Sequence, residues 1–170
     1  FDEIDIHEGT FLSSRFNVIS PQTTQQRFIL DNSNIDTTTI RVKIGQPGEV
    51  GRTYNAVDNI LSLNKNSEIY LLQEVQDEKY ELLFGDGLFG KQLSDGDIIR
   101  VSYIITDGQD GNGPANFSFQ GTFMDHNGVL ITPNDNVVLT TVNSASNGGE
   151  SESVSSIKYF APRLYSAQYR

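Results

Sequence analysis

The sequence contains no cysteine and only two histidines among its 170 residues. Without cysteine, disulfide frameworks, thiolate zinc sites and cysteine nucleophiles are all excluded. His7 and His126 alone provide little material for a histidine-based metal site or active site. No apolar run approaches the ~20 residues that a membrane-spanning helix needs. The chain also begins Phe1-Asp2-Glu3, with neither an initiator methionine nor a signal peptide, so we expect a piece of a longer protein.

Positive charge is scarce as well. Twelve Lys and Arg stand against 22 Asp and Glu, which gives a net charge of −10. A protein this acidic repels phosphate backbones, so we expect no nucleic-acid binding. Hydrophobic residues make up 36% of the chain, but ten Phe and seven Tyr offer large apolar areas for burial. The length suits roughly one domain of ~150 residues with a substantial core.

Short β-type runs separated by turn residues dominate the sequence. They cover residues 26–30, 38–44, 68–74, 79–84, 97–105, 129–131 and 136–140. Ile40, Val42 and Ile44 alternate with polar residues, which predicts a strand with one solvated face. The most apolar run, 97–105, is expected near the centre of a sheet.

Turn residues between these runs predict three antiparallel hairpins. The polar segments 31–34, 76–78 and 132–135 would connect 26–30 to 38–44, 68–74 to 79–84, and 129–131 to 136–140. Gln46-Pro47-Gly48 would interrupt the sheet.

The pattern changes to helical spacing near the end of the chain. Val154, Ile157, Ala161, Leu164 and Tyr165 form an apolar stripe, and Ser151 or Ser153 can cap its start. Pro162 interrupts the stripe, which predicts a short helix, a break and a second helix beginning at Pro162.

The expected fold is therefore mostly β, with antiparallel strands and hairpins, α+β overall, and a short broken helical segment at the C-terminal end. We expect a β-rich domain at 1–145, with 1–60 and 61–145 as possible subregions. Residues 146–170 would be a linker and the start of a helical segment that belongs to a following domain.

The segment Phe84-Gly85-Asp86-Gly87-Leu88-Phe89-Gly90 is the most distinctive motif. Its glycines suggest a phosphate-binding loop, but the Lys-Ser/Thr pair and the following helix signal are missing. A tight turn with positive φ at Gly87 is the better interpretation, with Phe84 and Phe89 anchoring its flanks to the core.

A second glycine-rich segment, residues 107–113, has the spacing of a calcium loop at its start. The twelfth position counted from Asp107 is Ser118, so the bidentate carboxylate of an EF-hand is missing. We expect a solvated turn that does not bind calcium.

Candidate catalytic residues are few. Acidic residues and His7 gather at the front of the chain (Asp2, Glu3, Asp5, His7, Glu8), which is also typical of a solvated terminus. His126 lies in the turn signal Asp125-His126-Asn127-Gly128, where exposure is expected. Neither a Gly-x-Ser-x-Gly elbow nor a His-Glu-x-x-His pair occurs. We therefore assign no catalytic, cofactor-binding or metal-binding residue, and we expect no enzyme activity. The enzyme alternative is a glycosidase that uses two of the carboxylates.

Phe117 and Phe119, together with the many tyrosines, suggest a contact surface. Aromatic residues at alternate strand positions belong more often to a core or a protein interface than to a carbohydrate-stacking platform. The glycan platform stays open as an alternative.

Three blocks together resemble the baseplate J-like family of contractile-tail bacteriophages. They are 84–90 with Leu93, Gly96-Asp97 and Tyr103; then Thr106-Asp107-Gly108 with Gly111-Asn112-Gly113; and finally 148–153 with Ile157, Ala161-Pro162-Arg163 and Gln168-Tyr169-Arg170. The resemblance covers roughly residues 68–113 and 146–170, and it depends on the order and spacing of the blocks.

This resemblance implies a structural component of a tail baseplate wedge. Such a component would self-associate through homodimer or ring contacts and would bind other wedge proteins in a ring that rearranges on contraction. It would lie in the virion tail baseplate, and in the host cytoplasm during assembly, with no cofactor and no catalytic residue. The alternative is a receptor- or glycan-binding β module of a tail fibre.

Overall fold

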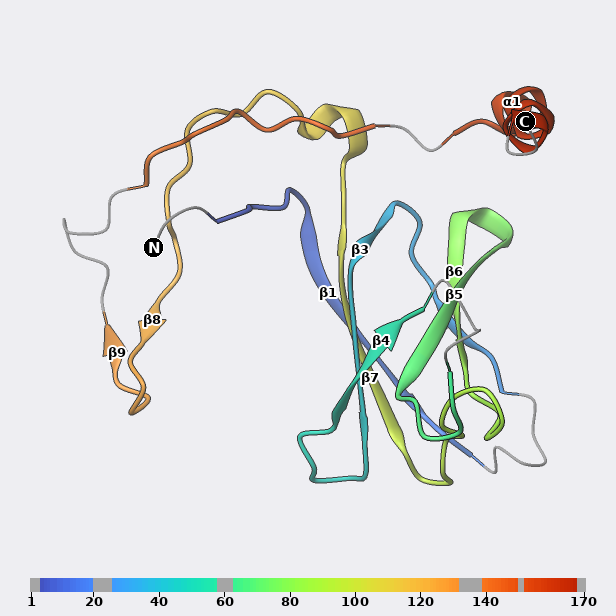
Figure 1. Cartoon of the computed structure of the whole chain (residues 1–170). Helices are drawn as coiled ribbons and strands as arrows, with labels where there is room; N and C mark the ends of the chain where they lie inside the picture. Colours follow the sequence, from blue (N-terminus) through green and yellow to red (C-terminus); the bar gives the residue numbers. More distant parts are fainter. Residues whose placement is uncertain (1–3, 20–25, 58–62, 132–138, 150–151, 168–170) are drawn as a thin grey trace. The chain divides into compact units, whose positions relative to one another are not determined.

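The computed structural model describes residues 4–19, 26–57, 63–131, 139–149 and 152–167. The chain divides into two units, Phe1–Asp107 and Gly108–Arg170, which are described separately. The first unit holds a β-sheet, and the second holds a small hairpin and a helix (Figure 1). A mostly β fold is therefore confirmed. The domain boundary expected after residue 145 stays a prediction.

The sheet of the first unit has seven strands. Their bounds are β1 Thr10–Asn17, β2 Phe28–Leu30, β3 Ile35–Gly45, β4 Arg52–Ala56, β5 Ile69–Val75, β6 Lys79–Phe84 and β7 Ile98–Ile105. The strands lie in the order β1-β7-β3-β4-β5-β6-β2. All neighbours are antiparallel except β4 and β5, which run parallel.

One predicted feature of this sheet is confirmed, and a second is met only in part. β5 and β6 form an antiparallel hairpin closed by the 3-10 turn η2 (Gln76–Glu78). β7 is an interior strand with β1 on one side and β3 on the other. Its inward residues Ile99, Val101 and Tyr103 are almost fully buried, but β7 lies next to the edge strand β1 and not at the centre of the sheet.

The predicted hairpin between 26–30 and 38–44 is wrong. β2 pairs with β6, and β3 pairs with β7 and β4. The polar link 31–34 connects β2 to β3, which are not neighbours in the sheet. Within this link, Asn32 Oδ1 accepts a hydrogen bond from the Tyr103 hydroxyl of β7 at 2.6 Å. Asn34 takes a positive φ of 57° in this link. A short polar segment between two strands can therefore connect strands that do not pair with each other.

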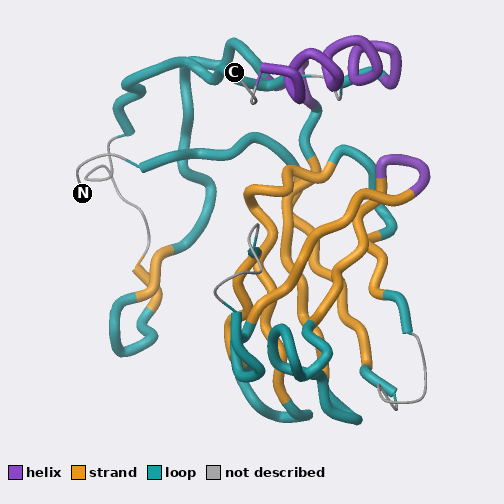
Figure 2. Tube along the Cα trace, turned by 45° about the vertical axis from the view of Figure 1, so that its right-hand side comes forward, coloured by secondary structure: helices purple, strands orange, loops and turns teal. Residues whose placement is uncertain are grey.

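The sheet curls so that its two edge strands approach each other (Figure 2). The rings of Phe16 on β1 and Phe28 on β2 meet edge to face, with centroids 5.7 Å apart. Phe28 contacts Phe84 in the same way at 5.6 Å. The core fills the inside of this curl, and Leu30, Val42 and Ile99 have no exposed area at all.

The second unit contains the 3-10 turn η3 (Gly108–Gly111), strands β8 (Phe123–Met124) and β9 (Leu130–Ile131), and helix α1 (Val154–Ala167). β9 pairs with β8, whereas the predicted hairpin of 129–131 with 136–140 stays a prediction. Residues 132–138 lie outside the described part, and 139–140 are not in a strand. The turn that closes the hairpin is Asp125–Gly128, where Asp125 Oδ1 accepts the amides of Asn127 and Val129 at 2.8 Å each. His126 is exposed there, as expected.

Helix α1 runs unbroken through Pro162, so the predicted break is wrong. Proline removes one backbone donor, and the helix continues on the hydrogen bonds of the turns on either side. The Ser153 hydroxyl accepts the amide of Ser156 at 3.3 Å, which confirms Ser153 as a cap. Among the described residues, no helix is long and apolar enough to cross a membrane.

Candidate functional site

The glycine-rich loop after β6 is a turn built on Asp86. Its Oδ1 accepts the amides of Leu88 and Phe89 at 2.9 Å each, and the Gly87 amide donates to the Gly90 carbonyl at 3.1 Å. The hydrogen bonds from the amides of Phe89 and then Leu88 lower the pKa of the Asp86 carboxyl. Gly87 has a φ of +90°, which confirms the predicted turn geometry.

The tip of this loop presents apolar side chains to solvent. Phe84 packs against the core as expected, but Phe89 is 58% exposed, so its predicted anchoring role is wrong. Leu88 beside it is 74% exposed. The two hydrogen bonds to Asp86 hold the backbone of this tip in place, because they fix the amides of the same two residues.

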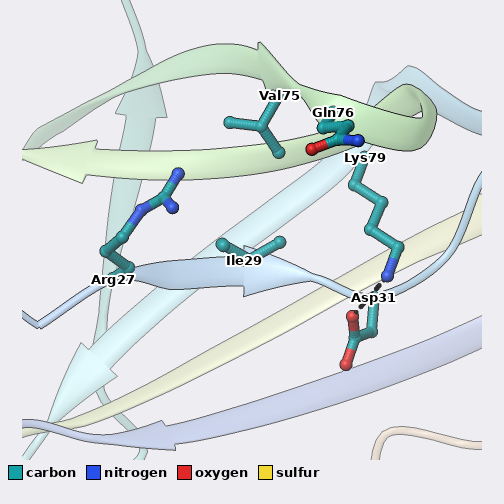
Figure 3. Close-up of a pocket in the computed structure, with 6 residues that line it drawn as sticks. All are labelled: Arg27, Ile29, Asp31, Val75, Gln76 and Lys79. Carbon is teal, nitrogen blue, oxygen red and sulfur yellow. Dashed lines mark hydrogen bonds and ion pairs between the residues drawn. The ribbon is translucent and has the colours of Figure 1, made fainter.

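A shallow pocket of about 420 Å³ lies between β2 and the β5–β6 hairpin (Figure 3). Its lining residues are Arg27, Ile29, Asp31, Val75, Gln76 and Lys79. Lys79 Nζ pairs with Asp31 Oδ1 at 2.8 Å, and this pair lowers the pKa of Asp31. Arg27 makes a two-pronged contact with Glu81, at 2.8 and 2.6 Å. Both cations of the pocket therefore have a carboxylate partner.

Glu68, just before β5, joins two cations. Its Oε1 pairs with Arg52 Nη1 at 3.0 Å and with Lys91 Nζ at 3.1 Å. Hydrogen bonds from Arg52 first, then from Lys91, lower the pKa of the Glu68 carboxyl. Nearby, burial raises the pKa of Tyr54 to about 12. The two ion pairs of Glu68 connect the start of β5 to β4 and to the residue that follows the glycine-rich loop, and so hold these segments together.

The structure does not bring the N-terminal acidic residues together into a site. His7 Nδ1 lies 3.6 Å from Asp36 Oδ2, and Glu8 Oε2 accepts the Asp107 amide at 3.2 Å. Asp5 is exposed, and Asp2 and Glu3 lie outside the described residues. Within the described part of the chain, no three His, Cys, Asp or Glu side chains are grouped as metal ligands.

The glycine-rich segment that starts like a calcium loop instead holds another loop in place. Asn112 Nδ2 donates to the Gly148 carbonyl, and the Gly148 amide donates to Asn112 Oδ1, both at 2.8 Å. The Gly113 amide donates to the Ala145 carbonyl at 2.9 Å. A side chain at position 148 would overlap the Gly108 carbonyl, so glycine is required for this approach. The sequence alone does not predict this Asn112–Gly148 clamp.

Helix α1 exposes an apolar surface. Ile157, Tyr159 and Phe160 are 46%, 57% and 50% exposed. The Tyr159 and Phe160 rings meet edge to face at 5.0 Å, and the Arg163 guanidinium lies 3.6 Å from the centre of the Tyr159 ring. The surface therefore combines two aromatic rings, an aliphatic side chain and a cation, a composition typical of protein interfaces.

Phe117 and Phe119 are partly exposed, but they lie on irregular backbone, so their assignment to a strand is wrong.

Comparison with known proteins adds no assignment. No protein-family model matches the chain, and no curated protein matches it either.

Proposed function

We propose that this chain is a structural component of a contractile-tail baseplate wedge, which self-associates and binds other wedge proteins. The order and spacing of the three motif blocks support this proposal. Such a protein would lie in the virion tail baseplate, and in the host cytoplasm during assembly, without a cofactor or a catalytic step.

The exposed surface of α1 is the observation that carries the proposal. A helix of 14 residues is marginal in water unless its apolar side chains are packed. Ile157, Tyr159 and Phe160 each leave about half of their surface in solvent. Burying apolar area stabilises by roughly 25 cal/mol per Å², so a partner that covers these side chains would stabilise both the helix and the complex.

The Asn112–Gly148 clamp supports a holding role for the second unit. It joins two irregular segments through paired hydrogen bonds rather than through a sheet. Such a joint keeps the segments in register and breaks at a modest cost, because a net hydrogen bond contributes about 0.5–1.5 kcal/mol. A part that must rearrange with its ring suits this kind of connection.

Affinity capture from cells producing contractile tails tests the proposal. The tagged chain should retain wedge proteins, identified by mass spectrometry. The variant Phe160→Ser should retain much less wedge protein than the wild type. The matched control Lys158→Ser, on the same helix, should retain as much as the wild type. Recovery without any wedge protein, or equal recovery by both variants, would contradict the proposal.

A glycan-binding module of a tail fibre is the second candidate. The partly exposed rings of Phe117 and Phe119 favour it, because sugars stack on exposed aromatic faces. Binding on a glycan array that disappears in Phe117→Ala would select this candidate over the first.

A further inference from the structure

Three cations lie side by side across the first unit's sheet. In the register of the strands, Arg15 on β1 stands opposite Arg100 on β7, and Arg100 stands opposite Lys43 on β3. Arg41 lies two residues before Lys43 on the same face of β3. These four residues, Arg15, Arg41, Lys43 and Arg100, are called the basic face below.

The basic face is on the outside of the curled sheet. Val42 and Ile44 on β3 are buried inside it, so Lys43 between them points away from the core. Ile99 and Val101 place Arg100 outward in the same manner. Arg15 and Lys43 are exposed, and Arg100 is half-buried between them.

This arrangement works against the stability of the isolated chain. Like charges directly opposite each other on neighbouring strands are destabilising. None of the ion pairs in the described part of the chain involves Arg15, Lys43 or Arg100. Buried nitrogens normally have an acceptor, yet Arg100 Nη1 is buried without one. A carboxylate supplied from outside would offset the repulsion between the exposed cations of this row.

The charge of the whole chain indicates what supplies it. Four of the twelve Lys and Arg residues lie in the basic face, while the chain carries 22 Asp and Glu. The remaining surface of a second copy is therefore strongly acidic. A basic face cannot pair with the basic face of another copy, so a contact between copies has to join two different surfaces.

We propose that the basic face binds an acidic surface of a second copy of this chain, in a head-to-tail contact. This inference rests on the proposed self-association and specifies its geometry. A head-to-tail contact closes into a ring or continues as a filament, whereas a two-fold dimer would use one surface twice. The guanidinium groups of Arg15, Arg41 and Arg100 suit the planar carboxylates of Asp and Glu.

Charge reversal tests the inference without threatening the fold. The double variant Arg15→Glu, Lys43→Glu places opposite charges on both sides of Arg100, which should preserve or raise the melting temperature. Lys65→Glu, an exposed lysine in a turn, controls for a change of charge sign elsewhere on the first unit. Sedimentation of the 170-residue chain at low and moderate salt measures association.

The wild type and Lys65→Glu should associate, more weakly at about 300 mM than at about 50 mM salt because screening reduces the attraction. The double variant should associate at least about tenfold more weakly with itself. Because it keeps its acidic surface, it should still bind wild-type chains and cap their growth in mixtures.

Equal association of the double variant and Lys65→Glu would overturn the inference, and so would failure of the double variant to bind wild-type chains. Tighter binding of a short single-stranded oligonucleotide than of the second copy would also overturn it, in favour of a nucleic-acid surface. These outcomes are separable from failure of the proposed function, because capture of wedge proteins through α1 does not require the basic face.

Discussion

Substitution of two glycines in the loop after β6 separates two physical effects. Gly87 has a φ of +90°, and a Cβ added there would meet only the Gln92 side chain, at 3.6 Å. Gly85 has no such backbone requirement, but a Cβ there would overlap the backbone of Gly90. Position 87 therefore tests backbone conformation, and position 85 tests close approach.

The expected magnitudes follow from these contacts. Gly87→Ala should cost about 1–2 kcal/mol, the usual penalty of a left-handed conformation for a residue with a Cβ. Gly87→Val should cost about 1–3 kcal/mol, because β-branched residues are strongly disfavoured there. Gly87→Asn should cost least, since asparagine tolerates positive φ. Gly85→Ala should cost more than Gly87→Ala, because the backbone at Gly90 has to move.

Thermal unfolding followed by circular dichroism measures these differences. For a unit of about this size, 1 kcal/mol corresponds to roughly 4 °C in melting temperature. Gly149→Ala is the control, because a Cβ at that position meets nothing within 4 Å. If Gly87→Val melts within a degree of the wild type, the turn does not require glycine and the reasoning fails. If Gly85→Ala behaves like Gly149→Ala, the close approach to Gly90 is wrong.

The other predictions concern pH and calcium. The pKa of Glu68 is lowered from 4.5, mainly by Arg52 and then by Lys91, so its contribution is present above pH 4.5 and is lost as pH falls through the lower folded-state pKa. In urea unfolding, Glu68→Gln should therefore lose less stability on acidification than the wild type; an identical loss in both would contradict this. The segment 107–113 should give no calcium dependence, because it lacks a bidentate carboxylate. A clear rise in melting temperature when calcium follows chelator treatment would refute that expectation.

Local signals predict the parts of the fold in which neighbouring residues decide the structure. The alternation of Ile40, Val42 and Ile44 places the inward face of β3 correctly. The link 76–78 predicts the β5–β6 hairpin, and the Asp86-Gly87 pair predicts positive φ. Each of these features has a local sequence signal, namely an alternation, a short polar link or a turn pair, and a single sequence contains that information.

Strand β1 escapes prediction because its inward face is not purely apolar. Leu12 and Phe16 point inward, but Ser14 lies between them, and its hydroxyl hydrogen-bonds the Tyr103 hydroxyl at 3.2 Å. The hydrogen-bond partner of Ser14 is 89 positions away in the sequence, so nothing local indicates that this serine can face inward. The serine therefore breaks the apolar alternation on which strand prediction depends. β4 is missed for a related reason, since Tyr54 is its only buried residue.

The candidate surfaces are less predictable than the fold, for a reason that the Asn112–Gly148 clamp illustrates. Asparagine and glycine next to each other indicate a turn, and nothing local says that the partner lies 36 positions away. The exposure of Phe89 is mispredicted likewise, because Asp86 fixes the backbone of the loop and leaves this ring pointing to solvent.

The basic face shows how a surface property arises from core packing. Arg15, Lys43 and Arg100 are far apart in the sequence, and only the pairing of β1, β7 and β3 aligns them. That pairing is fixed by the buried face, because a slip of one residue would turn Ile99 and Val101 outward and Arg100 into the core. The cost of burying an unpaired cation excludes such a slip. The core therefore holds three like charges in one row, and the proposed acidic partner would offset their repulsion.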